Sequence, residues 1–471
     1  MAVPPDILAV ERPKNTRVKQ SGSRFLVIKR TCKRVDGRNV PVELGTIGEI
    51  VDGKYVEKRS EPRPKGVDIK DYGEVMLCNS CADGLLQELA KVWDLGDAKR
   101  LYAIAVLRAA YGDVRNRDLQ MHYETSYLSE VIPGLHMSEN SVSKFLKETG
   151  MAYSFISEFM TNRVKSFAGR RIVIDGMLKD YNSETGSMSE FSRKGRIKGS
   201  KDISLMYAYD IEKMEPIAAK PYPGNMLDQS AIHDFVEEYS IEKGMLVLDK
   251  GFLSETFIDN ADSKDGLSYL IPLKKDSALI GRYGMDNPTE HLSGFKDRVI
   301  LYKKERMSNG KYLYAFRDPK EAYEQEVGYV QHAAKKESYD SEKYCGKKSQ
   351  FGLIVFRSAS DLDPLAVYSA YADRWDIEVM FNMYKNIIDR DTVNVHGDYS
   401  MYATEFINFL SVLIASRVKT RICSVKLNEK YSFKQIFKYL SKYKMVKVGD
   451  KKWQPATMLK YIQETTTLLG I

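Results

Sequence analysis

Short runs of β-forming residues dominate the start of the chain. Residues 24–30 and 40–47 are two such runs, and Asp36-Gly37 between them is a strong turn signal. From residue 85 to about residue 167 the apolar positions recur at helical spacing, most strongly in residues 98–111. The pattern predicts a β-rich N-terminal region followed by a helical one.

A pair of helices is predicted at the end of the helical region. Residues 115–131 form the first candidate, Pro133-Gly134 interrupts the chain, and Ser138 is suited to cap a second helix through Thr149. The apolar face of the second helix carries Val142, Phe145 and Leu146. Its polar face carries Asn140, Ser143, Lys144 and Lys147. The arrangement resembles a helix-turn-helix DNA reader; the alternative is an ordinary amphipathic pair.

From residue 171 onward the spacing of the apolar residues is typical of β-strands. Residues 171–175 form an apolar strand that ends in Asp175, and residues 205–209 and 216–222 are two further strand candidates. A helix over residues 229–242, capped by Asp228, precedes a second apolar strand, which ends in Asp249. Three strands, a helix and a strand are the opening order of an RNase H-like fold.

Residues 262–350 interrupt this order with a β-rich insertion. Residues 299–306 and 311–317 flank Ser308-Asn309-Gly310, a hairpin signal. A polar helical stretch follows, and residues 352–357 resume the strand pattern. Asp363-Pro364 then predicts the start of a long helix that reaches about residue 388.

The predicted fold class is therefore α/β. An RNase H-like core, a mixed sheet flanked by helices, is interrupted by the insertion and preceded by a β-plus-helical region that contains the candidate DNA-reading helix. The predicted segments are a β-rich region (1–83), a helical DNA-binding region (84–170), the first core segment (171–261), the insertion (262–350), the second core segment (351–425) and a basic C-terminal region (426–471).

Composition excludes several classes of protein. The chain has 471 residues, of which 43% are hydrophobic, which is too many for a disordered protein. Its longest apolar runs are shorter than the roughly 20 residues of a membrane helix, and five cysteines do not form a disulfide scaffold. We expect a cytoplasmic protein with no membrane partner.

Cys78-x2-Cys81 has no second pair nearby, so buried thiols are expected rather than zinc. There is no phosphate-loop motif, so no nucleotide cofactor is expected.

Charge is unevenly distributed along the chain. Residues 171–260 hold 16 acidic and 11 basic side chains, although the whole protein has a net charge of +8. So small an excess of acidic residues can arise by chance. The alternative interpretation is a carboxylate-rich site surrounded by surfaces that attract a polyanion. Residues 411–471 hold 13 basic and three acidic side chains. A basic loop near Asp175 is a candidate for DNA phosphate contact; its cations are Arg193, Lys194, Arg196, Lys198 and Lys201.

The predicted helix from residue 363 to 388 has a polar edge beside its apolar stripe. Tyr371, Arg374, Glu378 and Lys385 are spaced 3, 4 and 7 apart and fall within an arc of about 60°. A solvated ion-pair face is the simpler interpretation, because Arg374 and Glu378 are suited to pair at i, i+4.

The two strand-end aspartates favour a functional interpretation instead. Asp175, Asp249 and Glu378 are three carboxylates on rigid elements that can converge. Such oxygen ligands suit Mg²⁺ or Mn²⁺, and two ions about 4 Å apart support phosphodiester chemistry.

The same residues resemble a known family. Tyr371-x2-Arg374-x3-Glu378-x6-Lys385 matches the Tyr-Arg-Glu-Lys signature of bacterial insertion-sequence transposases of the DDE superfamily. Asp249-Lys250-Gly251-Phe252 resembles the second-aspartate motif of that family, and Gly224-Asn225-x2-Asp228 resembles its Gly-Asn-x2-Asp loop. Asp175 corresponds to the first catalytic aspartate. Many members carry a small hydroxyl residue two positions later, where this chain has Met177.

The resemblance implies cut-and-paste DNA transposition by a homodimer in the bacterial cytoplasm, in association with the nucleoid. Asp175, Asp249 and Glu378 would hold two Mg²⁺ ions. Hydrolysis at the terminal inverted repeat would free a 3′-OH, which in relatives forms a hairpin that is reopened before joining to target DNA. Arg374 and Lys385 would bind phosphates and Tyr371 would orient one of them. The alternatives are a nuclease that does not join strands and a domesticated DNA-binding protein without catalysis.

Overall fold

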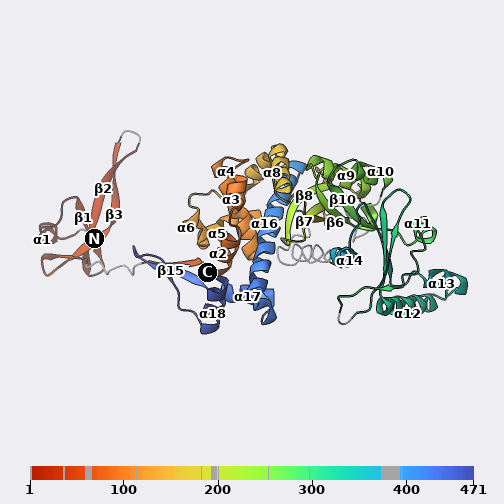
Figure 1. The fold of residues 1–471 in the computed structure, drawn as a ribbon. Coiled ribbons are helices and arrows are strands. Elements are labelled where there is room, and N and C mark those ends of the chain that lie inside the picture. Colours follow the sequence, from red (N-terminus) through yellow and green to blue (C-terminus); the bar gives the residue numbers. More distant parts are fainter. Residues whose placement is uncertain are drawn as a thin grey trace. The chain divides into compact units, whose positions relative to one another are not determined.

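The computed structural model describes most of the chain. The described residues are 3–35, 38–58, 66–112, 114–181, 183–191, 199, 201–226, 228–252, 254–295, 298–372, 393 and 395–471. They form two compact units (Figure 1). The smaller is Met1–Asp68 with Lys447–Trp453, and the larger is Ile69–Val446 with Gln454–Ile471.

The smaller unit is built on an antiparallel sheet of order β1-β2-β3-β4. Its elements are α1 (Pro5–Leu8), β1 (Thr16–Ser21), β2 (Arg24–Val35), β3 (Arg38–Val51) and β4 (Lys54–Glu57). Val18, Val27 and Ile50 form its small apolar core. The two predicted N-terminal strands are confirmed, and Val35 pairs with Arg38 on either side of the predicted turn.

The larger unit begins with a helical layer. Its elements are β5 (Val67–Asp71), α2 (Gly73–Cys81), α3 (Leu85–Leu89), α4 (Leu95–Tyr111), η1 (Asn116–Asp118), α5 (Leu119–Thr125), α6 (Leu128–Val131), α7 (Glu139–Met151) and α8 (Tyr153–Ser166). Helix α4 confirms the predicted helix over 98–111. Asp94 caps it by accepting hydrogen bonds from the backbone N–H groups of Gly96 and Asp97.

The prediction of one helix over residues 115–131 was wrong. Three short helices stand there, because the chain is extended at Ser126 and forms a bridge with Asp71. The backbone N–H of Tyr127 donates to the carbonyl of Asp71 at 2.8 Å. A tertiary contact with β5 thus overrides a helical sequence pattern.

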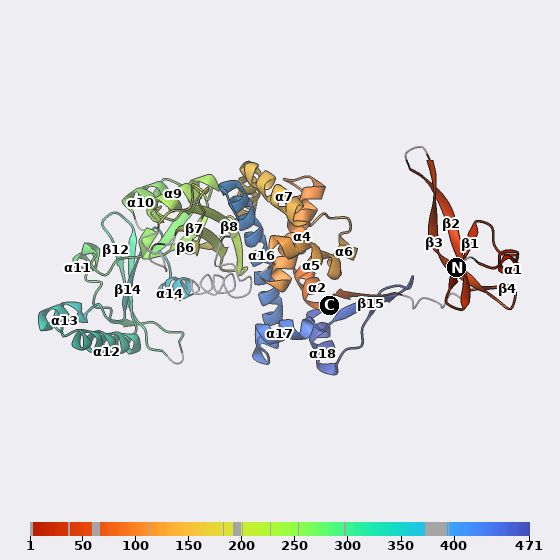
Figure 2. The same ribbon diagram turned by 180° about the vertical axis from the view of Figure 1, so that it is seen from behind.

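The long helix α16 (Asp398–Ser424) connects this helical layer to the sheet of the larger unit. It packs against α4 and α7 on one side and against β8 on the other (Figures 1 and 2). Its residues from Thr404 to Ser416 are buried throughout. No sequence pattern had predicted this helix.

The central sheet has nine strands in the order β11-β12-β13-β14-β10-β9-β6-β7-β8. Its first half comprises β6 (Arg171–Asp180), β7 (Asp202–Asp210), β8 (Glu215–Pro223), α9 (Asp228–Glu238), β9 (Gly244–Leu248), η2 (Lys250–Phe252), α10 (Glu255–Asp262) and β10 (Leu267–Pro272). Strands β6, β7 and β8 are antiparallel neighbours, whereas β9 is parallel to both β6 and β10. The order of strands and helix predicted from the sequence is confirmed.

One strand of this sheet is longer than predicted. Strand β6 continues five residues past Asp175, because Asp175 pairs with Tyr207 and Asp180 with Asp202 of β7. Asp175 therefore lies within a strand and not at its end.

The second half of the sheet holds the predicted hairpin. Its elements are α11 (Ala278–Arg282), β11 (Glu290–His291), β12 (Leu301–Arg306), β13 (Tyr312–Arg317), α12 (Pro319–Lys335), α13 (Ser341–Lys348), β14 (Leu353–Ser358) and α14 (Pro364–Ala372). Strand β10, which pairs with β9, lies in the range assigned to the insertion, and β11 to β14 extend the same sheet. The division into six segments stays a prediction.

The chain ends in a small α/β region. Its elements are η3 (Leu427–Glu429), α17 (Phe433–Leu440), β15 (Lys444–Val448), β16 (Gln454–Pro455) and α18 (Lys460–Leu469). Strands β16, β15 and β5 form a third sheet. None of the helices in the described ranges is long and apolar enough to cross a membrane.

Candidate active site

The parallel register of β6 and β9 brings two of the predicted carboxylates together. Ile174 of β6 pairs with Leu248 of β9, and Asp175 and Asp249 are the residues that follow. Adjacent strands lie about 4.8 Å apart, and paired positions of a parallel register project to the same face. The sheet therefore places the two aspartates side by side.

Local backbone contacts fix both aspartates. Asp175 is half-buried, and its Oδ1 accepts a hydrogen bond from the backbone N–H of Gly176 at 2.8 Å. Asp249 is also half-buried, and its carbonyl accepts from the backbone N–H of Phe252 at 3.0 Å, which closes the turn η2. Buried apolar residues precede both, namely Ile174 and Leu248. The carboxylates thus sit at the boundary between the core and solvent.

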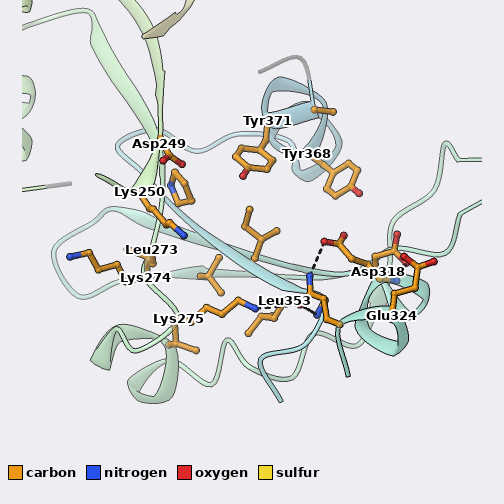
Figure 3. A pocket seen from close by; sticks show the side chains of 18 of the residues that line it. Asp249, Lys250, Leu273, Lys274, Lys275, Asp318, Glu324, Leu353, Tyr368 and Tyr371 are labelled. Atoms are coloured by element: carbon orange, nitrogen blue, oxygen red, sulfur yellow. Dashed lines mark hydrogen bonds between the residues drawn. The ribbon is translucent and has the colours of Figure 1, made fainter. Parts of the chain in front are cut away.

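A cavity of about 1690 Å³ opens beside Asp249. Figure 3 shows Asp249 and Lys250 on one side of it and Tyr371 of α14 facing them. Lys274 and Lys275, which follow β10, line the same side as Lys250. The side of the cavity next to Asp249 therefore carries three cations.

Lys275 is held in place within this wall. Its Nζ donates to the carbonyl of Gln350 at 3.0 Å and to Oε1 of Gln325 at 3.4 Å. Burial lowers the pKa of Lys275, Glu321 opposes this shift, and Lys250 adds to it. A cation with these neighbours is stabilised by a bound anion.

The side of the cavity next to α12 carries both carboxylates and cations, the latter being Arg298 and Lys320. Asp318 and Glu324 lie on this side, and Glu321 lines the cavity as well. Asp318 caps α12 through the backbone N–H groups of residues 320 and 321, and its Oδ2 accepts from Arg298 at 2.6 Å. Burial alone would raise the pKa of Asp318, but the hydrogen bonds from Arg298 and from the helix N-terminus outweigh it and leave that pKa below its usual value. Asp318 is thus held as a carboxylate by Arg298 and by the start of α12.

Helix α14 supplies the tyrosine of the predicted signature. Asp363 caps the helix as predicted, because its Oδ2 accepts from the backbone N–H of Ala366 at 3.1 Å. The ring of Tyr371 packs edge-on against Phe356 at 4.7 Å and lines the cavity. Arg374, Glu378 and Lys385 lie outside the described residues. Within the ranges that are described, no three His, Cys, Asp or Glu side chains are grouped to hold a metal ion.

Comparison with known proteins identifies the family. Residues 168–412, more than half of the chain, match the transposase DDE domain family. The chain belongs to this family. The resemblance to DDE transposases is thereby confirmed, whereas the Tyr-Arg-Glu-Lys subgroup and a bacterial origin stay predictions.

Two further comparisons add little to this assignment. No curated protein matches the chain. Among solved structures, the chain is similar to the cryo-EM structure of a piggyBac transposase synaptic complex with hairpin DNA, with 12% identity and a TM-score of 0.41. That match covers 84% of this chain and 85% of the other. A TM-score this low does not support a conclusion about the fold or the function of this chain.

The transposase's Gly-Asn loop has a steric reason for its glycine. A Cβ on Gly224 would lie 2.4 Å from the carbonyl oxygen of Asp202 and 2.7 Å from that of Glu190. The loop therefore packs against the start of β7, where the basic loop ends. Of that basic loop, Arg193, Lys194, Arg196 and Lys198 lie outside the described residues. Nζ of Lys201 lies 5.7 Å from the ring centroid of Phe191.

The candidate DNA-reading helix α7 has the predicted two faces. Val142, Phe145 and Leu146 are buried. Asn140, Ser143, Lys144 and Lys147 are exposed. Lys144 lies 3.6 Å from Glu148 in an exposed ion pair. None of the four polar residues lines the cavity beside Asp249, and the helix before α7 is only four residues long. Their contact with DNA stays a prediction.

The two spaced cysteines are thiols in the helical layer. Cys78 is buried and Cys81 is half-buried. Burial raises the pKa of the Cys78 thiol well above its usual value, and Cys81 adds to the shift.

Lys274 and Lys275 are the cavity residues that sequence reasoning missed. Their signal is present in hindsight, since they follow the apolar strand over residues 267–272, and the carboxyl ends of parallel strands share one edge of a sheet. This signal is useful only once β10 is known to be parallel to β9, and that pairing is seen only in the structure.

Proposed function

We propose that this chain is a DNA transposase that cleaves DNA at transposon ends and transfers the freed strands into target DNA. The observation that carries the proposal is the register of β6 and β9, which places Asp175 beside Asp249 in a chain of the transposase DDE domain family.

The catalytic core is proposed to be RNase H-like. The strand order β8-β7-β6-β9-β10, with three antiparallel strands followed by two parallel ones, supports this assignment. The strands β11 to β14 would then be the insertion, together with the adjoining helices.

The donor set fits a divalent cation. Asp175 and Asp249 offer half-buried carboxylate oxygens on rigid backbone, which Mg²⁺ and Mn²⁺ prefer. Glu378 is proposed as the third carboxylate, and two ions are proposed per site. When bound, such ions lower the pKa of water and stabilise the leaving oxygen of a phosphodiester.

The side chains around the cavity would position the DNA. Lys250, Lys274 and Lys275 line the side next to Asp249, where they would neutralise phosphates that flank the scissile bond. Glu324 on the side next to α12 would repel the backbone and so direct it toward the lysines. Tyr371 faces Asp249 across the cavity, where its hydroxyl would orient a phosphate. Arg374 and Lys385 are proposed to bind phosphates beside it.

The proposed reaction has two phosphoryl transfers. Water attacks the phosphodiester at the transposon end, and the bond to the 3′ oxygen breaks, which leaves a 3′-OH. That hydroxyl then attacks a second phosphodiester and displaces its 3′ oxygen, so the number of bonds is conserved. A homodimer would hold two ends for a cut-and-paste cycle, in which a hairpin is a proposed intermediate.

The proposal is tested with a labelled duplex from the DNA that flanks this chain's own gene. Asp175→Asn and Asp249→Asn should bind the duplex as the wild type does but neither cut nor join it in Mg²⁺. Asp259→Asn, which changes an exposed aspartate of α10, is the matched control and should retain both activities. Cutting by either variant at the wild-type rate would refute the proposal. Cutting without joining by the wild type would support a nuclease instead.

A further inference from the structure

A second cavity, of about 660 Å³, lies in the larger unit between the helical layer and the sheet. Four cations line it, namely Arg108 of α4, Arg115 and Arg117 of the η1 segment, and Lys179 of β6. Glu139, at the exposed start of α7, is the carboxylate of this lining. The cavity has no part in the chemistry proposed above.

The base of this cavity holds a fixed guanidinium. Arg108 is fully buried, and its Nη1 donates to Oδ1 of Asn408 at 3.0 Å. Its Nη2 donates to Oδ1 of Asn116 at 3.2 Å. These two amide oxygens orient the guanidinium at the base of the cavity. Lys179 also lines the cavity, and its Nζ lies 2.7 Å from the carboxylate of Glu405.

A buried hydroxyl also lines the cavity. Thr404 of α16 is 4% exposed, and within the described part of the chain its Oγ1 has no hydrogen-bond partner. A buried polar atom in this state costs about 1–3 kcal/mol of stability. A bound oxyanion would satisfy it, since a hydroxyl donates readily to phosphate oxygens.

We propose that this cavity binds a backbone phosphate of the DNA on which the enzyme acts. The proposal rests on the proposed function. It adds a binding site on the face of β6 that carries the catalytic aspartate, because Asp175 and Lys179 are four residues apart and project to the same face. The separation of about 13 Å along the strand equals the rise of roughly four base pairs along the axis of a DNA duplex, at 3.4 Å each. The cavity would thus fix the DNA a few nucleotides from the scissile bond.

Thr404→Val separates this role from a structural one. Valine has nearly the shape of threonine but lacks the hydroxyl, so the variant should be as stable as the wild type or more so. Its affinity for the end duplex should nevertheless fall by about tenfold, the loss expected for one hydrogen bond to a charged group. Thr420→Val on the same helix is the matched control, because Oγ1 of Thr420 already donates to the carbonyl of Ser416.

Arg115→Gln tests whether the positive charge around the cavity contributes to DNA binding. Arg115 is exposed at the cavity rim, so its loss should weaken duplex binding and reduce the salt slope of binding by about one unit. Both variants are read out by duplex affinity alone, whereas Asp249→Asn should bind the duplex normally and not cut it. A failure of the catalytic proposal therefore leaves the affinity test intact.

Two results would overturn the proposal. The first is wild-type affinity and salt slope in both Thr404→Val and Arg115→Gln. The second is a combination of two findings: inorganic phosphate raises the melting temperature of the wild type but not of Thr404→Val, and both proteins bind the duplex equally well. The cavity would then hold free phosphate and not DNA.

Discussion

The ion pair between Lys179 and Glu405 joins the catalytic strand β6 to helix α16. Nζ of Lys179 lies 2.7 Å from Oε1 of Glu405, and the two side chains are only 1% and 4% exposed. Nδ2 of Asn408 donates to the same carboxylate oxygen at 3.3 Å. We predict that Glu405→Gln and Lys179→Met each strongly destabilise the larger unit.

The magnitude follows from burial. At 2.7 Å and an effective dielectric constant of about 20, the two charges attract each other by about 6 kcal/mol, and desolvation offsets much of this. Removing one partner leaves the other charge buried, which costs about 3–5 kcal/mol. Replacing both removes that penalty, and glutamine still offers an acceptor to Asn408. The double variant should therefore lie within about 1.5 kcal/mol of the wild type.

Urea unfolding followed by tryptophan fluorescence measures these free energies. Trp93 stacks on Phe406 at 5.2 Å, directly beside Glu405, so it reports on this region. Glu148→Gln, which removes an exposed ion pair with Lys144, is the control and should change stability by no more than about 0.5 kcal/mol. If the double variant loses as much free energy of unfolding as the two single variants together, the coupling between Lys179 and Glu405 is refuted.

Three further predictions concern other parts of the larger unit. Gly150→Ala should cost about 1–3 kcal/mol in urea unfolding, because its Cβ would lie 1.7 Å from the carbonyl oxygen of Tyr399; a neutral effect would contradict this packing. Burial and the neighbouring Asp71 raise the pKa of Glu74 to about 7, so the contribution of Glu74 to stability should be fully present below about pH 4.5 and be lost as the pH rises through 7. Glu74→Gln should remove this component, worth about 3 kcal/mol, and an unchanged pH profile of unfolding would exclude it. Lys147→Ala should weaken duplex binding measured by mobility shift if α7 contacts DNA, and unchanged binding would exclude that contact.

Several elements of this protein could be predicted because local signals determine them. The apolar runs before Asp175 and Asp249 predicted β6 and β9, since buried parallel strands are apolar on both faces. Asp363-Pro364 predicted the start of α14, because capping depends on adjacent residues alone. The pair of aspartates could therefore be identified before their register was known.

Other elements depend on contacts between distant parts of the chain. Strand β6 extends to Asp180 because β7 pairs along it, and residues 115–131 break into short helices because Tyr127 binds the backbone of Asp71. Helix α16 is buried on several sides, so it lacks the one-sided apolar stripe by which amphipathic helices are found. The lysines beside Asp249 and the cations around Arg108 converge only in the folded protein. No spacing rule in the sequence could have grouped them.

The central claim is that Asp175 and Asp249 act as one catalytic centre, and a double-mutant cycle of end-cleavage rates tests it most directly. Asp175→Asn and Asp249→Asn should each lower the rate by about a thousandfold or more. Because residues that act as a unit have non-additive effects, the double variant should be no slower than the slower single variant. Losses that multiply in the double variant, or a wild-type rate in either single variant, would contradict the claim.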